Sequence, residues 1–91
     1  MKLVWAAPAQ ADLHALADYY RQIDVELSHR MRLRIEWTPA LLATFPKLGT
    51  LLGSSSIRKL RVQQTPYVLY YRPELDRIVV LRVIHSARDI P

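Results

Sequence analysis

The sequence predicts an α+β fold in which a helical hairpin packs on one face of a small, mainly antiparallel sheet. In the first half of the chain, apolar residues recur every three or four positions, the spacing of an amphipathic helix. In the second half they alternate along short segments, which is the spacing of a strand. The elements follow the order β-α-α-β-β-β, and helices grouped before a run of strands favour this fold class.

The length of 91 residues allows a single domain, residues 1–91, with one core. The chain has no cysteine, which excludes disulfides, thiolate chemistry and cysteine–zinc sites. No segment approaches the ~18 apolar residues of a membrane span. The apolar stretch near the start is also too short for a signal peptide. We therefore expect a cytoplasmic protein whose stability comes from packing.

The first elements are a short strand and a helix. The strand is expected at residues 2–6, ended by Pro8. The helix is expected from Pro8 to Ile23, because proline suits a first helical turn. Its apolar face consists of Leu13, Leu16, Ala17, Tyr20 and Ile23.

A second helix is expected after Asp24, which can serve as its N-cap. Pro39 lies within this segment, and an interior proline costs about 3 kcal/mol or bends the helix. We therefore expect a kink or break at which Thr38 caps a new turn and Pro39 takes its first position. The apolar stripe of this helix consists of Leu27, Met31, Ile35, Leu42 and Phe45.

The rest of the chain is expected to form a loop and three strands. Residues 46–56 contain a proline, two glycines and three consecutive serines, which is typical of a loop. Strands are expected at residues 57–63, 66–72 and 77–85. The links between these strands are short, which indicates antiparallel hairpins.

Strand alternation sorts the side chains of the predicted sheet into two faces. We assign the sides without arginine to the helices: Leu60, Val62, Tyr67, Leu69, Tyr71, Val79, Leu81, Val83 and His85. The face turned away from the helices, called here the far face, then consists of Lys59, Arg61, Val68, Tyr70, Arg72, Ile78, Val80, Arg82 and Ile84.

The far face is apolar at its centre and basic around it. Strands that are apolar on both sides normally have both sides covered, and two helices cover only one. An exposed apolar patch usually marks a partner site, and the arginines favour an acidic partner. The alternative is that the N-terminal strand or the serine-rich loop folds over part of the patch.

The net charge of +5 lies entirely in the second half of the chain. Residues 1–45 carry five Lys/Arg and five Asp/Glu, whereas residues 46–91 carry eight against three. This asymmetry favours an anionic partner, either nucleic acid or an acidic protein segment. The alternative to an anionic partner is a basic surface that only keeps the protein soluble, and charge alone does not decide between the two.

Eight short segments follow one another in a recognisable order and spacing: Val4-Trp5 with Pro8, Ala11-Asp12-Leu13, Tyr19-Tyr20, Phe45-Pro46-x-x-Gly49, Arg58-x-Leu60-x-Val62, Pro66-Tyr67-x-Leu69-x-Tyr71, residues 78–83 and His85-x-x-Arg88. In this order and spacing they resemble the ParE branch of the RelE/ParE toxin superfamily. The resemblance covers nearly all of the chain, although no single segment is specific.

The resemblance implies the toxin of a type II toxin–antitoxin system. In this family the C-terminal segment of a cognate antitoxin, expected here to be acidic and amphipathic, wraps around the toxin. The antitoxin's N-terminal part binds the operon's own DNA, so operator DNA would be reached only through the antitoxin in a hetero-oligomer. ParE-like toxins inhibit DNA gyrase by binding, which implies a protein that is not itself an enzyme.

The alternative is a RelE-like, ribosome-dependent mRNA endonuclease, with Arg82, His85 and Arg61 as the catalytic residues. RNA cleavage requires a general base, a general acid and cations. By alternation, however, His85 lies on the helix side, where a structural hydrogen bond is the simpler role. The resemblance also implies that relatives which cut RNA carry several lysines and arginines in the middle of the sheet and a further base or aromatic residue near the C-terminus. Here lysines are scarce and no tyrosine or histidine follows His85, and this departure favours the gyrase-directed branch. A third possibility is a chain that keeps the fold and antitoxin binding but has lost toxicity.

No cofactor or metal is expected. His14 and His29 have no ligand partners at metal-binding spacing. Gly49 and Gly53 are not followed by the Lys-Ser/Thr pair of a phosphate-binding loop. The candidate functional residues are therefore those of the far face, which we expect to bind the antitoxin or the target.

Overall fold

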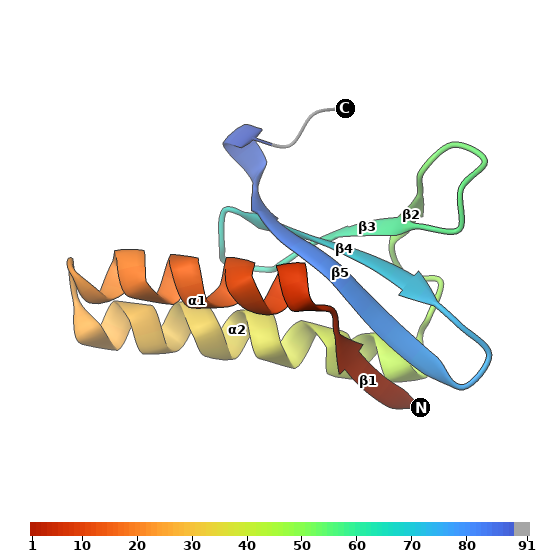
Figure 1. Ribbon diagram of the computed structural model, residues 1–91, viewed down its shortest axis with the longest axis horizontal. Helices are drawn as coiled ribbons and strands as arrows, with labels where there is room; N and C mark the ends of the chain where they lie inside the picture. Colours follow the sequence, from red (N-terminus) through yellow and green to blue (C-terminus); the bar gives the residue numbers. More distant parts are fainter. Residues whose placement is uncertain (89–91) are drawn as a thin grey trace.

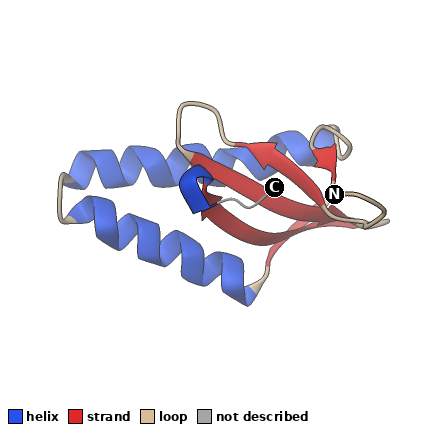
Figure 2. Ribbon diagram, turned by 90° about the horizontal axis from the view of Figure 1, so that it is seen from above, coloured by secondary structure: helices blue, strands red, loops and turns tan. Residues whose placement is uncertain are grey.

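The computed structural model describes residues 1–88 of the chain. Two helices form an antiparallel hairpin that packs on a five-stranded sheet (Figure 1). The tip of this hairpin projects beyond one end of the sheet (Figure 2). The elements are β1 (Lys2–Trp5), α1 (Ala7–Arg21), α2 (Val25–Thr44), β2 (Thr50–Leu51), β3 (Arg58–Arg61), β4 (Tyr67–Pro73), β5 (Arg77–His85) and the 3-10 turn η1 (Ser86–Arg88).

The strand order in the sheet is β1-β5-β4-β3-β2. β1 runs parallel to β5, and the other neighbours are antiparallel. The predicted α+β fold with helices on one side of a mainly antiparallel sheet is therefore confirmed. The loop predicted over residues 46–56 also holds the two-residue strand β2, which extends the sheet beside β3.

The helical hairpin is held by polar contacts as well as by packing. Asp24 caps α2 as predicted, because its side chain accepts hydrogen bonds from the backbone N–H groups of Glu26 and Leu27. The buried Ser28 hydroxyl donates to the carbonyl of Ala17, which ties α2 to α1 at a distance of 2.7 Å. The hairpin is thus fixed near its turn.

The predicted break at Pro39 is wrong, because α2 runs through it as one helix. The Thr38 hydroxyl donates to the carbonyl of Arg34 within the same helix and does not cap a new turn. Thr38 and Pro39 are both buried, so packing on the sheet stabilises the helix against the loss of one backbone hydrogen bond. Phe45, expected in the core, is mostly exposed at the C-cap.

A β-bulge in β5 corrects the predicted face assignment. Tyr70 pairs with Arg82, but Tyr71 pairs with Val80, so Leu81 has no partner on β4. One extra residue turns every preceding side chain to the opposite face. Ile78 and Val80 therefore face the helices, and both are fully buried. Val79 moves to the far face, where it pairs with Arg72.

The core lies between the helical hairpin and the near face of the sheet. It includes the apolar face of α1, the inward side of α2 and the middle of β4 and β5. The core residues are Ala9, Leu13, Leu16, Ile35, Leu42, Val62, Tyr67, Leu69, Tyr71, Ile78, Val80 and Val83.

Within residues 1–88, no helix is long and apolar enough to cross a membrane.

Candidate functional site

An open groove of about 770 Å³ runs between α2 and the outer side of β3. Most of its lining is apolar, and Trp37 is the most prominent side chain, with 73% of its surface exposed. Large exposed apolar side chains that gather on one surface usually mark a site for a partner. The groove is lined by Arg30, Leu33, Arg34, Trp37, Thr38, Ala40, Leu41, Leu48, Leu60, Arg61, Gln63 and Gln64.

The groove exists because α2 has two apolar faces. Ile35 and Leu42 face the core, as the sequence predicts. Leu33, Trp37 and Leu41 recur every four residues, so they form a second stripe on another side of the helix. All three are exposed. Sequence analysis missed this stripe because it assigned α2 a single buried face.

Three arginines lie in the groove without a carboxylate partner among residues 1–88: Arg30, Arg34 and Arg61. Arg34 donates to the backbone carbonyl of Gln64, which places it beside the turn between β3 and β4. The other end of the groove is formed by Leu41 and Leu48. Its positive charge is therefore concentrated at one end.

One wall of the groove is held by a buried tyrosine. The Tyr71 hydroxyl accepts a hydrogen bond from the Gly49 N–H and donates one to the carbonyl of Pro46, both at 2.8 Å. Arg58 donates to the carbonyl of Gly49, also at 2.8 Å. These contacts fix the segment that carries Leu48 into the groove. They also give a physical reason for the Phe45-Pro46-x-x-Gly49 resemblance.

The far face brings together seven of the nine residues assigned to it. Lys59, Tyr70 and Arg82 form one cross-strand row. Arg61, Val68 and Ile84 form another, and Arg72 lies opposite Val79. Because the bulge removes Ile78 and Val80 and Val68 is only 4% exposed, the exposed apolar centre is smaller than predicted.

Neither the N-terminal strand nor the serine-rich loop lies across the far face. The N-terminal strand β1 is part of the sheet, beside β5. The segment with the serines joins β2 to β3 at the opposite edge, where Figure 1 shows it as a projecting loop.

Arg82 is not an unpaired cation, because it forms a two-point ion pair with Asp12 of α1. Its Nε and Nη2 atoms lie 2.7 and 2.9 Å from the two Asp12 oxygens. These hydrogen bonds raise the pKa of Arg82 above its ordinary value. Asp12 also accepts the backbone N–H of Val83 at 2.9 Å. The carboxylate thus binds the part of β5 that extends beyond β1.

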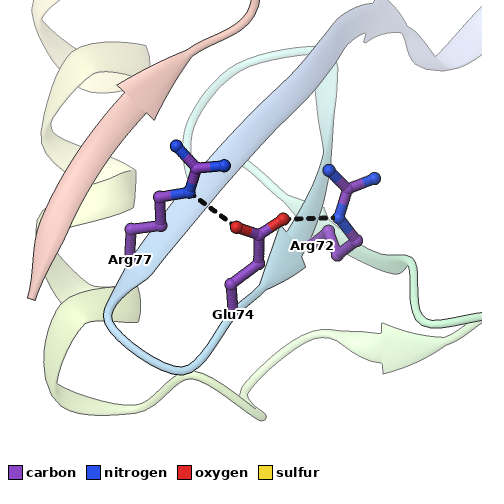
Figure 3. A network of polar contacts seen from close by, with 3 residues as sticks. All are labelled: Arg72, Glu74 and Arg77. Atoms are coloured by element: carbon purple, nitrogen blue, oxygen red, sulfur yellow. Dashed lines mark hydrogen bonds and ion pairs between the residues drawn. The ribbon is translucent and has the colours of Figure 1, made fainter.

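Arg72 is also paired. Glu74 lies in the turn between β4 and β5 and contacts two arginines at once (Figure 3). Its carboxylate accepts hydrogen bonds from Arg77 at 2.6 Å and from Arg72 at 3.0 Å. These two bonds lower the pKa of Glu74. Two of the basic residues predicted for partner binding, Arg72 and Arg82, therefore have carboxylate partners within the chain.

His85 lies on the helix side of the sheet, as alternation predicts. It pairs with Tyr67 across β4 and β5, and their rings meet edge to face at 5.4 Å. Its Nδ1 atom accepts the N–H of Ala87 at 3.1 Å. By strand register Arg61 and Arg82 lie on the far face, and Arg61 also lines the groove at the edge of the sheet. The structure therefore separates His85 from the two arginines proposed to act with it in RNA cleavage.

Within residues 1–88, no three His, Asp or Glu side chains lie close enough together to hold a metal ion. The chemistry that the described surface offers is recognition through apolar contact and positive charge. The groove provides both, whereas the ion pairs Arg72–Glu74 and Arg82–Asp12 reduce the charge of the far face.

Comparisons with known proteins agree with this fold. The chain is similar to a solved structure described as a chromosomal ParDE TA system from P. aeruginosa, with a TM-score of 0.78 and 24% sequence identity. That match covers 93% of this chain and 95% of the other. At such identity it establishes the fold alone.

Two sequence comparisons are more specific. The chain is 34% identical over 87 residues to Toxin RelE2 of Caulobacter vibrioides, which covers 96% of this chain and 97% of that protein. The family model for the ParE toxin of the type II toxin–antitoxin system parDE matches residues 3–90. The chain therefore belongs to the ParE toxin family of type II toxin–antitoxin systems.

Proposed function

We propose that this toxin acts by binding, without breaking bonds: a cognate antitoxin occupies the groove between α2 and β3, and DNA gyrase is the target. The observation that carries the proposal is the apolar groove with three arginines that have no carboxylate partner within residues 1–88. An acidic, amphipathic segment of the antitoxin matches both features of this surface.

The antitoxin part of the proposal is supported by how proteins recognise helical segments. An amphipathic helix places its apolar side in a hydrophobic groove through residues spaced three and four apart. Trp37, Leu41 and Leu60 provide the apolar surface here. The name of the solved relative, a ParDE TA system, supports a partner of this class for a chain with the same fold.

The preference for binding over RNA cleavage is supported by the polar contacts. Cleavage requires an acid and a base within reach of one phosphate, with cations around it. His85 faces away from Arg61 and Arg82, and Asp12 occupies two nitrogens of the Arg82 guanidinium. The choice of gyrase as the target is supported by the resemblance to the ParE branch, whose members inhibit gyrase, and this chain matches the ParE toxin family.

The far face is proposed as the surface that contacts the target. Lys59, Tyr70 and Ile84 are partly exposed there. A Tyr70→Ala variant should lose toxicity while it still binds the antitoxin. The matched control is Tyr19→Ala, because Tyr19 is an exposed tyrosine at the tip of the helical hairpin. If Tyr70→Ala weakened antitoxin binding instead, the far face would be the antitoxin site, and the proposed roles of the far face and the groove would be wrong.

The decisive experiment is induction of the toxin in bacteria, alone and together with the antitoxin gene. Gyrase inhibition should give DNA breaks and filamentous cells, and co-expression of the antitoxin should suppress both. Rapid arrest of translation with cut transcripts, lost in an Arg82→Ala variant, would establish the RelE-like nuclease instead. Normal growth on induction alone would indicate a chain that keeps the fold without toxicity.

A further inference from the structure

We propose that the groove determines the direction of its ligand: it takes an antitoxin helix that runs antiparallel to α2 and carries its acidic residues in its last turn. This inference rests on the proposed function, because it takes the antitoxin as the occupant. It adds the orientation and the charge pattern of the bound segment.

The length of the groove sets the length of the bound helix. The part of α2 that lines it extends from Arg30 to Leu41, which are eleven positions apart. At 1.5 Å per residue this distance is about 16 Å. A partner helix of about three turns matches it, with three or four apolar side chains on the side that faces the groove.

The charge of the groove is the feature that distinguishes its two ends. Arg30, Arg34 and Arg61 lie toward the turn after β3, at the end marked by the hydrogen bond from Arg34 to Gln64. Leu41 and Leu48, at the other end, are apolar and exposed. A helix with acidic residues at one end is therefore matched in only one orientation.

The backbone of the partner helix favours the same orientation. The last turn of a helix has carbonyl oxygens without partners and a partial negative charge. Guanidinium groups can donate to these carbonyls and to acidic side chains next to them. The last turn of the partner should therefore lie against Arg30, Arg34 and Arg61. Because Arg30 and Arg34 lie in the first half of α2, the partner then runs in the opposite direction.

The test uses two synthetic helices of identical composition and identical apolar stripe. One peptide carries three glutamates in its last turn and the other carries them in its first turn. Both are acetylated and amidated to remove terminal charges, and both are lactam-bridged so that circular dichroism shows equal helicity. The first peptide should bind the toxin about tenfold more tightly at low salt, since three partly exposed ion pairs are gained. Equal affinities or the reverse order would overturn the proposal.

Variants of the toxin assign the difference to the groove. Arg34→Glu should abolish the preference between the two peptides, and Arg30→Glu should do the same without removing a hydrogen bond to Gln64. The matched control is Arg21→Glu on α1, outside the groove, which should leave the tenfold preference unchanged. A preference that survives both groove variants would contradict the proposal.

A measurement on the cognate antitoxin separates this inference from the proposed function. A spin label at the C-terminal end of its helical segment should broaden the amide signals around Arg30, and a label at the N-terminal end those around Leu48. The opposite pattern would overturn the orientation while leaving the groove as the binding site. Broadening at neither end, with the antitoxin bound, would overturn the groove itself.

Discussion

Asp12 and Arg82 join the first helix to the last strand through two hydrogen bonds of 2.7 and 2.9 Å, although they are seventy positions apart in sequence. The same carboxylate accepts the Val83 N–H. Asp12 therefore takes the place of a neighbouring strand where β1 ends. This relationship explains the aspartate in the Ala11-Asp12-Leu13 segment by structure and not by contact with a partner.

The two members of this pair should contribute unequally to stability. Asp12→Ala removes the ion pair and leaves the Val83 N–H without its acceptor, so it should cost about 2–3 kcal/mol in urea unfolding. Arg82→Ala keeps the bond to Val83 and should cost about 1 kcal/mol or less, because Arg82 is half-exposed. Asp18→Ala, which breaks the exposed pair with Arg21, is the control and should change little. If Arg82→Ala lost as much stability as Asp12→Ala, the role of Asp12 as acceptor for the Val83 N–H would be contradicted.

The two glycines should respond differently to alanine. At Gly49 a Cβ atom would lie 2.8 Å from both the Lys59 carbonyl oxygen and the Tyr71 ring, so Gly49→Ala should cost about 1–3 kcal/mol through overpacking. At Gly53 nothing lies within 4 Å, but φ is +53°, so Gly53→Ala should cost about 1 kcal/mol through backbone strain. Only Gly49→Ala should also weaken antitoxin binding, because it displaces the wall that carries Leu48. If Gly49→Ala and Gly53→Ala weakened antitoxin binding equally, the role of the Leu48 wall in binding would be contradicted.

Tyr71→Phe tests the hydroxyl that holds the same wall. The variant keeps the buried ring but leaves the Gly49 N–H and the Pro46 carbonyl without their partner. The expected loss is about 1–3 kcal/mol in thermal or urea unfolding. Hydrogen exchange at the Gly49 amide should accelerate by more than the global loss of stability explains. Unchanged exchange there would show that the segment is held by other contacts.

Acid should remove the stabilisation that Glu74 provides. Its pKa in the folded chain is lowered by Arg77 and Arg72, so the unfolded chain binds its proton more readily. Glu74 therefore stabilises the fold above the ordinary glutamate pKa, and this contribution disappears as the pH falls through the lowered value. At neutral pH, Glu74→Gln should unfold at lower urea than the wild type, and the difference should vanish in strong acid. A difference that is independent of pH would be inconsistent with this origin.

Residue patterns predicted the elements well where local chemistry decides them. Asp24 was identified as the N-cap of α2, and the strand boundaries fall within two residues of those expected. Pro39 was misjudged because a proline penalty is local, whereas the burial that offsets it depends on tertiary packing. The face assignment is correct for β3, β4 and the residues of β5 after Leu81, and it is wrong for Ile78, Val79 and Val80, which precede the bulge. A bulge adds one residue to a strand without a distinctive sequence, so alternation could not reveal it.

The candidate site was only partly predictable for similar reasons. The four-residue spacing of Leu33, Trp37 and Leu41 was visible in the sequence, and a search for a second apolar stripe on α2 would have found it. The partner of Arg82 was not visible, because Asp12 is brought to it by the fold and not by sequence spacing. Charge alone could not show which arginines already have carboxylate partners.

The parallel pairing of β1 with β5 has a consequence for how the toxin is made. Lys2 lies opposite Arg77, so the sheet closes only after residues 77–80 have been synthesised (Figure 1). The helical hairpin forms from contacts close in sequence, whereas this closure brings together two segments that lie about seventy-five positions apart, residues 2–5 and 77–80. Completion of the sheet should therefore be the last and slowest folding event. While β5 is still inside the ribosome, the nascent chain would expose the helical hairpin without a complete sheet. An antitoxin already in the cell would therefore encounter the toxin while its fold is being completed.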